Sequence, residues 1–141
     1  MKTSLTVWGH FHAAHRLMNH IGKCKRLHGH DWKVRVMFHG DVNPNTGMLR
    51  DFAVLKRVVN DIMGIYDHRT ILHGEDPLAK FLETNKLFAN WLWIIDEHPT
   101  AEVLAQRIYS KLVEAIHGDK SLMVLCVEVF ETDENSAKVS G

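Results

Sequence analysis

The sequence HDWKVRVMFH, residues 30–39, decides the fold class of this chain. Apolar side chains fill every second position from Trp32 to Phe38, and most of the positions between them are charged. This alternation predicts a β-strand with one face against a core. A weaker alternation over residues 5–12 predicts a second strand before it.

Two amphipathic helices are predicted after these strands. Asp51 is a fair N-cap for a helix over residues 52–66, where apolar residues recur at three- and four-residue spacing. Thr100 caps the second helix in the same way, and Gly118 ends it.

The last strand, residues 122–132, is largely apolar on both faces. By parity, one face holds Met123, Leu125, Val127 and Val129, and the other holds Val124, Cys126 and Phe130. The order strand, strand, helix, helix, strand predicts an α+β domain with helices on one face of a mostly antiparallel sheet. Because the other face would be apolar and wet, we expect a second subunit to cover it.

The length and composition indicate one domain over residues 1–141, with 45% apolar and 24% charged residues. The segment 73–98 is the hardest to assign: Asp76-Pro77 favours the start of a short helix, and residues 90–95 favour a short strand. The polar tail from Asp133 is predicted to be frayed.

Charge and hydropathy exclude several classes of protein. The 17 basic residues balance 17 acidic ones, which removes the electrostatic argument for nucleic-acid binding. No apolar run approaches the roughly 18 residues of a membrane span, and the first residues lack the apolar core of a secretory signal. Two widely separated cysteines indicate free thiols and a cytoplasmic protein.

The chemical signal lies in CKRLHGH, residues 24–30, within a chain that has 11 histidines. His28 and His30 are two apart on a strand, so their side chains point the same way with Cα atoms about 6.5 Å apart. Two imidazoles so placed can bind one zinc ion, and His15 on the neighbouring strand is the best-placed third ligand. The alternative is that these are ordinary hydrogen-bonded histidines without a metal. The histidines at positions 10 and 12 have the same spacing, so the spacing alone is not specific for a metal site.

Cys24 has two interpretations that lead to different proteins. As a fourth zinc ligand it would complete a closed structural site of one cysteine and three histidines. As a free thiol it would stand beside an open catalytic site, with its thiolate favoured by Lys23, Lys25 and Arg26.

Two further positions carry acid–base chemistry. Asp67 precedes His68 just after the first helix and can orient its imidazole, although such a dipeptide is common at helix ends. Glu131 shares the parity of apolar strand residues, so its carboxylate needs a partner such as the N–H edge of a ligand. The alternative is that Glu131 turns into solvent at the strand end.

Taken together, these segments resemble the 6-pyruvoyl-tetrahydropterin synthase family. The resemblance runs from about residue 5 to 132, except for residues 73–98. It rests on six segments in order: FHAAHRL (11–17), Cys24 followed by HGH (28–30), GMLRDF (47–52), YDH (66–68), PTAE (99–102) and VFET (129–132). The three-residue gap between Cys24 and His28 is most similar to the bacterial 6-carboxytetrahydropterin synthase branch of queuosine and 7-deazaguanine biosynthesis.

The resemblance implies a tunnelling fold: a four-stranded antiparallel sheet with two helices on one face, assembled into an oligomeric barrel. It also implies a homo-oligomer, most often a hexamer, with pockets at the subunit interfaces. Zn²⁺ would be held by His15, His28 and His30, with its open position toward the side chain of 7,8-dihydroneopterin triphosphate. There it would act as a Lewis acid on the substrate oxygens.

The remaining roles are likewise implied by the resemblance. Cys24 as thiolate would take a carbon-bound proton, and His68, oriented by Asp67, would relay protons. Glu131 would grip the amino-pyrimidine edge of the pterin, with Thr100 also at the substrate. Loss of acetaldehyde and triphosphate would then give 6-carboxy-5,6,7,8-tetrahydropterin.

The chain also departs from the family pattern. His73 stands where the family has an asparagine, and the segment 73–98 is longer than the bacterial pattern. Alternative products are therefore a 6-pyruvoyl pterin or a 6-hydroxymethyl pterin of folate metabolism. A different class of function is a zinc-stabilised binding module without turnover, in which Cys24 ligates the metal.

Overall fold

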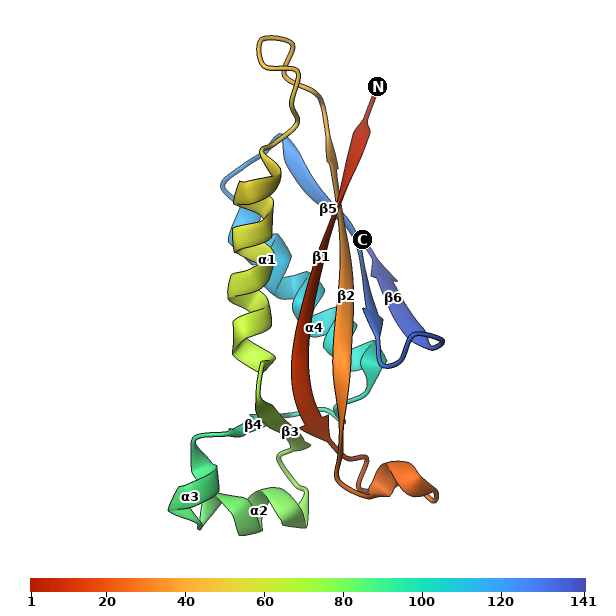
Figure 1. Ribbon diagram of the computed structural model, residues 1–141, viewed down its shortest axis with the longest axis vertical. Coiled ribbons are helices and arrows are strands. Elements are labelled where there is room, and N and C mark those ends of the chain that lie inside the picture. Colours follow the sequence, from red (N-terminus) through yellow and green to blue (C-terminus); the bar gives the residue numbers. More distant parts are fainter.

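In the computed structural model, which describes residues 1–141, two long helices cover one face of a six-stranded sheet (Figure 1). The strand order is β4-β3-β1-β2-β5-β6. The strands are β1 (Thr3–His15), β2 (His28–Gly40), β3 (Arg69–His73), β4 (Leu92–Ile95), β5 (Leu122–Phe130) and β6 (Ser136–Ser140). The helices are α1 (Phe52–Tyr66), α2 (Pro77–Glu83), α3 (Lys86–Ala89), α4 (Ala101–Ile116) and the short 3-10 turn η1 (Lys23–Lys25).

The long pair β1 and β2 forms the centre of the sheet. The strands are antiparallel, and their register runs from Thr3 opposite Gly40 to His15 opposite His28. All four alternating apolar residues of β2, from Trp32 to Phe38, have no exposed surface. Both predicted strands are confirmed, and each extends further than the alternation alone indicates.

Both long helices begin where their capping residues predict. The Asp51 carboxylate accepts a hydrogen bond from the Ala53 N–H at 2.8 Å, and the Thr100 hydroxyl accepts one from the Val103 N–H at 3.2 Å. Helix α1 packs against β1 and α4 against β5, which encloses the hydrophobic core between helices and sheet. None of the helices combines the length and the apolar character needed to cross a membrane.

The sheet has six strands where four antiparallel ones were expected. Strand β3 pairs parallel with β1, and β4 pairs parallel with β3. The tail predicted to be frayed instead supplies β6, which pairs antiparallel with β5. The short strand predicted within residues 90–95 is confirmed as β4, and the helix predicted at Asp76-Pro77 is confirmed as α2. Strands β3 and β6 were not predicted, because five residues are too short to show a periodic pattern.

A β-bulge at Leu125 corrects the predicted faces of β5. Met37 pairs with Cys126, whereas the next residue of β2 pairs with Val124, so Leu125 has no partner in the ladder. Parity therefore changes at Leu125, and Val124 lies with the buried Val127. Met123 is on the opposite face and is 56% exposed. The second face of the sheet is less apolar than predicted, and its burial by another subunit stays a prediction.

A buried carboxylate joins α2 to the end of β1. Asp76 has no exposed surface, accepts a hydrogen bond from the Leu78 N–H at 2.8 Å as the N-cap of α2, and is paired with Arg16. Burial raises the pKa of Asp76, but the hydrogen bonds from Arg16 and Leu78 outweigh it, so the pKa lies below its usual value. Because Arg16 directly follows His15, this pair holds α2 beside the histidine cluster described below.

Replacing Asp76 by alanine should therefore lower the free energy of unfolding by about 3 kcal/mol, because it removes a helix cap and leaves Arg16 unpaired. Chemical denaturation of both proteins measures the difference. Asp133→Ala is the matched control: Asp133 pairs with Lys33 at 2.8 Å but is 82% exposed, so its loss should be much smaller. If both variants lose the same free energy of unfolding, the buried pair stabilises the protein no more than the exposed pair does.

Candidate metal centre and active site

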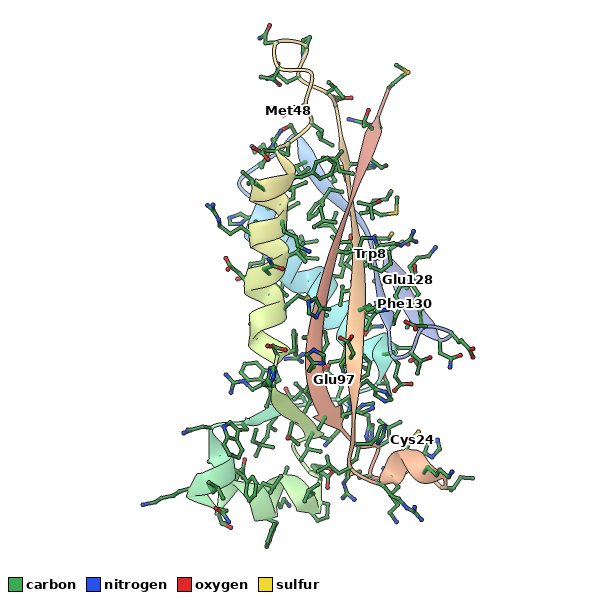
Figure 2. All side chains as sticks on the ribbon, in the orientation of Figure 1. Trp8, Cys24, Met48, Glu97, Glu128 and Phe130 are labelled. Atoms are coloured by element: carbon green, nitrogen blue, oxygen red, sulfur yellow. The ribbon has the colours of Figure 1, made fainter.

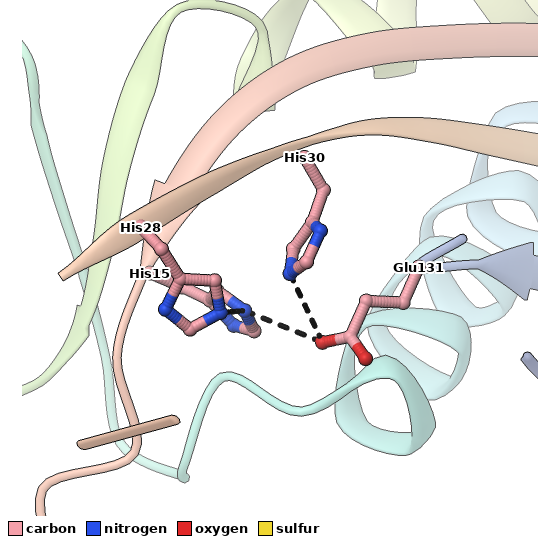
Figure 3. A group of neighbouring side chains, drawn as sticks. All are labelled: His15, His28, His30 and Glu131. Atoms are coloured by element: carbon pink, nitrogen blue, oxygen red, sulfur yellow. Dashed lines mark hydrogen bonds and ion pairs between the residues drawn. The ribbon is translucent and has the colours of Figure 1, made fainter. Parts of the chain in front are cut away.

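Three imidazoles meet where β1 ends and β2 begins (Figure 3). In the antiparallel register His15 lies opposite His28, and His30 is two residues further along β2 on the same face. Their ring centroids lie 4.6 to 5.2 Å apart. The structure thus brings together the three residues that the sequence indicated as metal ligands.

Two backbone carbonyls fix which nitrogens of these rings are free. Nδ1–H of His15 donates to the carbonyl oxygen of Pro99 at 2.7 Å, and Nδ1–H of His28 donates to that of Arg26 at 2.6 Å. The two Nε2 atoms then face each other at 3.1 Å. In the neutral rings both atoms carry lone pairs, and a metal ion between them satisfies both.

His30 and Glu131 complete the group. Nε2 of His30 is buried and has no hydrogen-bond partner. One carboxylate oxygen of Glu131 lies 3.3 Å from Nε2 of His15 and 3.5 Å from Nε2 of His30. The ligand atoms of all four residues lie within 4.8 Å of one another. Three nitrogens and one oxygen at this spacing fit a tetrahedral zinc ion.

The electrostatics favour the metal-binding form of the rings. Burial lowers the pKa of His15, which is 1% exposed, and also lowers the pKa of His30. Both imidazoles are therefore neutral at neutral pH, and a neutral imidazole is the form that binds a metal.

Cys24 does not belong to this group of donors. It lies half-buried in η1, within the loop that joins β1 to β2 (Figure 2), and its thiol is free. The fourth donor beside the histidines is Glu131 instead. The structure therefore does not form the closed site of one cysteine and three histidines that was one of the two interpretations.

Asp67 and His68 form an oriented pair at the end of α1. Nδ1–H of His68 donates to one carboxylate oxygen of Asp67 at 2.8 Å, and the backbone N–H of His12 donates to the other at 2.9 Å. The His12 hydrogen bond is the largest cause of a lowered Asp67 pKa, and His68 adds to it. His68 has a φ of 58°, in the left-handed region, and its Nε2 is left free on an exposed ring.

A hollow of about 500 Å³ adjoins His68, and His12 and Asp31 also line it. Both His30 and His68 line it, whereas Cys24 does not. No hydrogen bond joins Cys24 to Asp67 or His68 either. Within a single chain, His68 and one of the candidate metal ligands, His30, thus line the hollow, and Cys24 lies outside it.

Thr100 and the backbone carbonyls of Pro99 and Arg26 lie around the site and have structural roles there. The hydroxyl of Thr100 caps α4, so its role toward a substrate stays a prediction. The carbonyls of Pro99 and Arg26, which orient the ligands, were missed as contributors by sequence reasoning. Only the position of Pro99 in the PTAE segment indicated that this turn belongs to the site.

Comparison with known proteins agrees with these observations. A family model described as 6-pyruvoyl tetrahydropterin synthase matches residues 4–141. A 6-carboxy-5,6,7,8-tetrahydropterin synthase of Synechocystis sp. is 36% identical over 133 residues, which cover 91% of this chain and 85% of the relative. A 6-carboxy-5,6,7,8-tetrahydropterin synthase of Rickettsia typhi is 28% identical over 127 residues, which cover 86% of this chain and 88% of the relative.

Solved structures share the fold over nearly the whole chain. An uncharacterized protein from Wolinella succinogenes superposes with a TM-score of 0.83 at 22% identity, covering 99% of this chain and 98% of that one. The 6-pyruvoyl tetrahydropterin synthase of Caenorhabditis elegans superposes with a TM-score of 0.74 at 24% identity, covering 100% and 96%. The predicted α+β tunnelling fold is confirmed.

Proposed function

Because the chain belongs to the 6-pyruvoyl tetrahydropterin synthase family of pterin enzymes, we propose that it is a zinc-dependent 6-carboxytetrahydropterin synthase. The proposed reaction converts 7,8-dihydroneopterin triphosphate to 6-carboxy-5,6,7,8-tetrahydropterin, with loss of acetaldehyde and triphosphate. We place it in queuosine and 7-deazaguanine biosynthesis. The names of the relatives support the carboxy product.

The observation that carries the proposal is the pair of Nε2 atoms of His15 and His28, which face each other at 3.1 Å with their Nδ1 atoms already bonded to carbonyls. Two atoms that each lie about 2.0–2.1 Å from one ion stand about 2.8–3.4 Å apart. The spacing of the two rings therefore supports a shared metal ion. A bound zinc ion supplies Lewis acidity toward oxygen atoms of the substrate side chain.

The other residues divide the acid–base work in the proposal. Asp67 holds His68 in the tautomer whose Nε2 accepts a proton, as a relay requires. Cys24 takes a proton from carbon as thiolate. Glu131 turns from the histidines to accept two N–H groups from the pyrimidine edge of the pterin.

We also propose that the active site is completed by assembly. Within one chain Cys24 lies outside the hollow that His30 and His68 line. A homo-oligomer with pockets at its subunit interfaces, most simply a hexamer, can bring the thiol of one copy to the His68 of another. Sedimentation at micromolar concentration measures this, and a monomer with full activity would contradict it.

The product is tested by incubating zinc-loaded protein with 7,8-dihydroneopterin triphosphate and analysing the mixture by mass spectrometry. We expect a carboxylated tetrahydropterin together with an equal amount of acetaldehyde. A pyruvoyl or hydroxymethyl pterin would refute the carboxy product and leave the family assignment intact. Protein that holds zinc and binds the pterin without any turnover would support the non-catalytic alternative.

A further inference from the structure

A second cluster of metal-binding side chains lies on the face of the sheet away from the helices. It consists of His10, His12 and Asp31, whose ligand atoms lie within 4.8 Å of one another. His12 stands directly opposite Asp31 in the β1–β2 register, and His10 is two residues away on the same face. Their neighbours Phe11 and Trp32 point the other way and are fully buried. The sheet itself therefore separates this cluster from the His15 site.

The distances within the cluster suit a shared ion better than hydrogen bonds. One carboxylate oxygen of Asp31 lies 3.7 Å from Nδ1 of His12 and 3.8 Å from Nδ1 of His10. Both separations are too long for a hydrogen bond. They exceed the spacing of two ligand atoms on one ion, about 2.8–3.6 Å, by only a few tenths of an ångström. Small rotations of exposed rings are enough to close that gap.

The charges around the cluster leave the Asp31 carboxylate available. Lys33 lies opposite His10 in the register, but its ammonium is held by Asp133 at 2.8 Å. Arg35, the next outward-facing residue of β2, is held by Glu128 at 2.9 Å. Because each cation already has its own carboxylate, neither takes Asp31 from the two imidazoles.

Space for further ligands adjoins the cluster on both sides. The hollow of about 500 Å³ that His68 lines is also lined by His12 and Asp31. A second hollow of about 300 Å³ is lined by His10, Asp31 and Lys33. An ion held by the three side chains would thus have open positions toward water or an anionic ligand.

We propose that His10, His12 and Asp31 form a second metal site, which binds a divalent first-row transition ion through two imidazoles and one carboxylate. These donors suit ions such as Zn²⁺, Co²⁺ and Ni²⁺. The side chains of His10 and His12 have no hydrogen-bonded partners that orient them, unlike those of His15 and His28. Since such partners strengthen metal binding by about 10- to 100-fold, the second site should bind that much more weakly.

The test is a titration of metal-free protein with Co²⁺. Calorimetry and the visible absorption of the bound ion both monitor the titration. We expect two binding steps per chain, the second about 10- to 100-fold weaker than the first. His10→Asn and Asp31→Asn should each remove the weaker step and keep the tighter one, whereas His28→Asn should remove the tighter one. Both His10 and Asp31 are exposed, so their variants should fold.

The matched control is His117→Asn, which removes an exposed imidazole at the far end of α4. Both steps should persist in this variant. A single step in the wild-type protein, or a weaker step that survives both His10→Asn and Asp31→Asn, would overturn the second site. Loss of both steps in His10→Asn would also overturn it, because sites on opposite faces of the sheet should be independent.

Discussion

Cys24→Ala should lower kcat by about three orders of magnitude while the protein keeps its zinc and its melting temperature. The expected loss of kcat follows from the usual contribution of a positioned general base to the rate, which is about 10²- to 10⁴-fold. Zinc should be retained because the three imidazoles that would hold it, those of His15, His28 and His30, are unchanged and Cys24 is not among the donor atoms grouped there. Steady-state kinetics, metal analysis and a thermal melt of the same preparation measure all three quantities.

The matched control for this prediction is Cys126→Ala. Cys126 is the other cysteine, is 6% exposed on β5, and lies in the ladder opposite Met37. Its replacement should lower the melting temperature slightly and leave kcat nearly unchanged. If Cys24→Ala instead releases zinc and lowers the melting temperature, then Cys24 is a ligand and the enzyme interpretation is wrong.

The centre of the fold could be predicted because it is long and regular. The alternation in β2 extends over enough residues to exclude a helix, and its four apolar side chains are fully buried as expected. The starts of α1 and α4 were predicted correctly because Asp51 and Thr100 bond to the backbone within their own first turn. Such local chemistry is present in the sequence itself.

Of the edge strands only β4 was predicted, within residues 90–95, and β3 and β6 could not be predicted, for the opposite reason. Strands β3 and β4 depend on parallel pairing with β1 and with each other, and β6 depends on β5. Four or five residues carry no reliable period, and only the partner strand makes them strands. The bulge at Leu125 likewise arises from the pairing of β5 with β2 and has no signature in the sequence of β5.

The same bulge explains why strand parity predicts the direction of the Glu131 side chain although it fails for the first part of β5. The alternation of faces predicted for Met123 and Leu125 is wrong, because the bulge shifts it by one residue. Val127 and Val129 come after the bulge, and both are buried, so the alternation from them to Glu131 is correct. Glu131 accordingly points to the histidines. The sequence could not show that the carboxylate lies against the metal ligands, because no local pattern relates β5 to the start of β2.

That position makes Glu131→Gln the sharpest test of the site. A carboxylate can serve as fourth metal ligand, or it can release the histidines and hold the pterin. We expect the second, with zinc affinity nearly unchanged and KM for the pterin raised about 100-fold or more. Two charge-assisted hydrogen bonds contribute about 1.5–3 kcal/mol each, and glutamine keeps the shape but replaces one acceptor by a donor that faces N–H groups.

Glu128→Gln provides the control for this change on the same strand. Glu128 lies on the opposite face of the sheet (Figure 2), where it pairs with Arg35 at 2.9 Å and accepts a hydrogen bond from Ser136 at 2.7 Å. It contacts neither the histidines nor the hollow beside them, so neither zinc affinity nor KM should change. If Glu131→Gln instead releases zinc and KM rises only in proportion to the lost metal, then Glu131 is a ligand. The pterin would then be held by another residue. KM is compared at full zinc occupancy, so a metal ligand would change zinc affinity alone, whereas a pterin-binding residue would change KM alone.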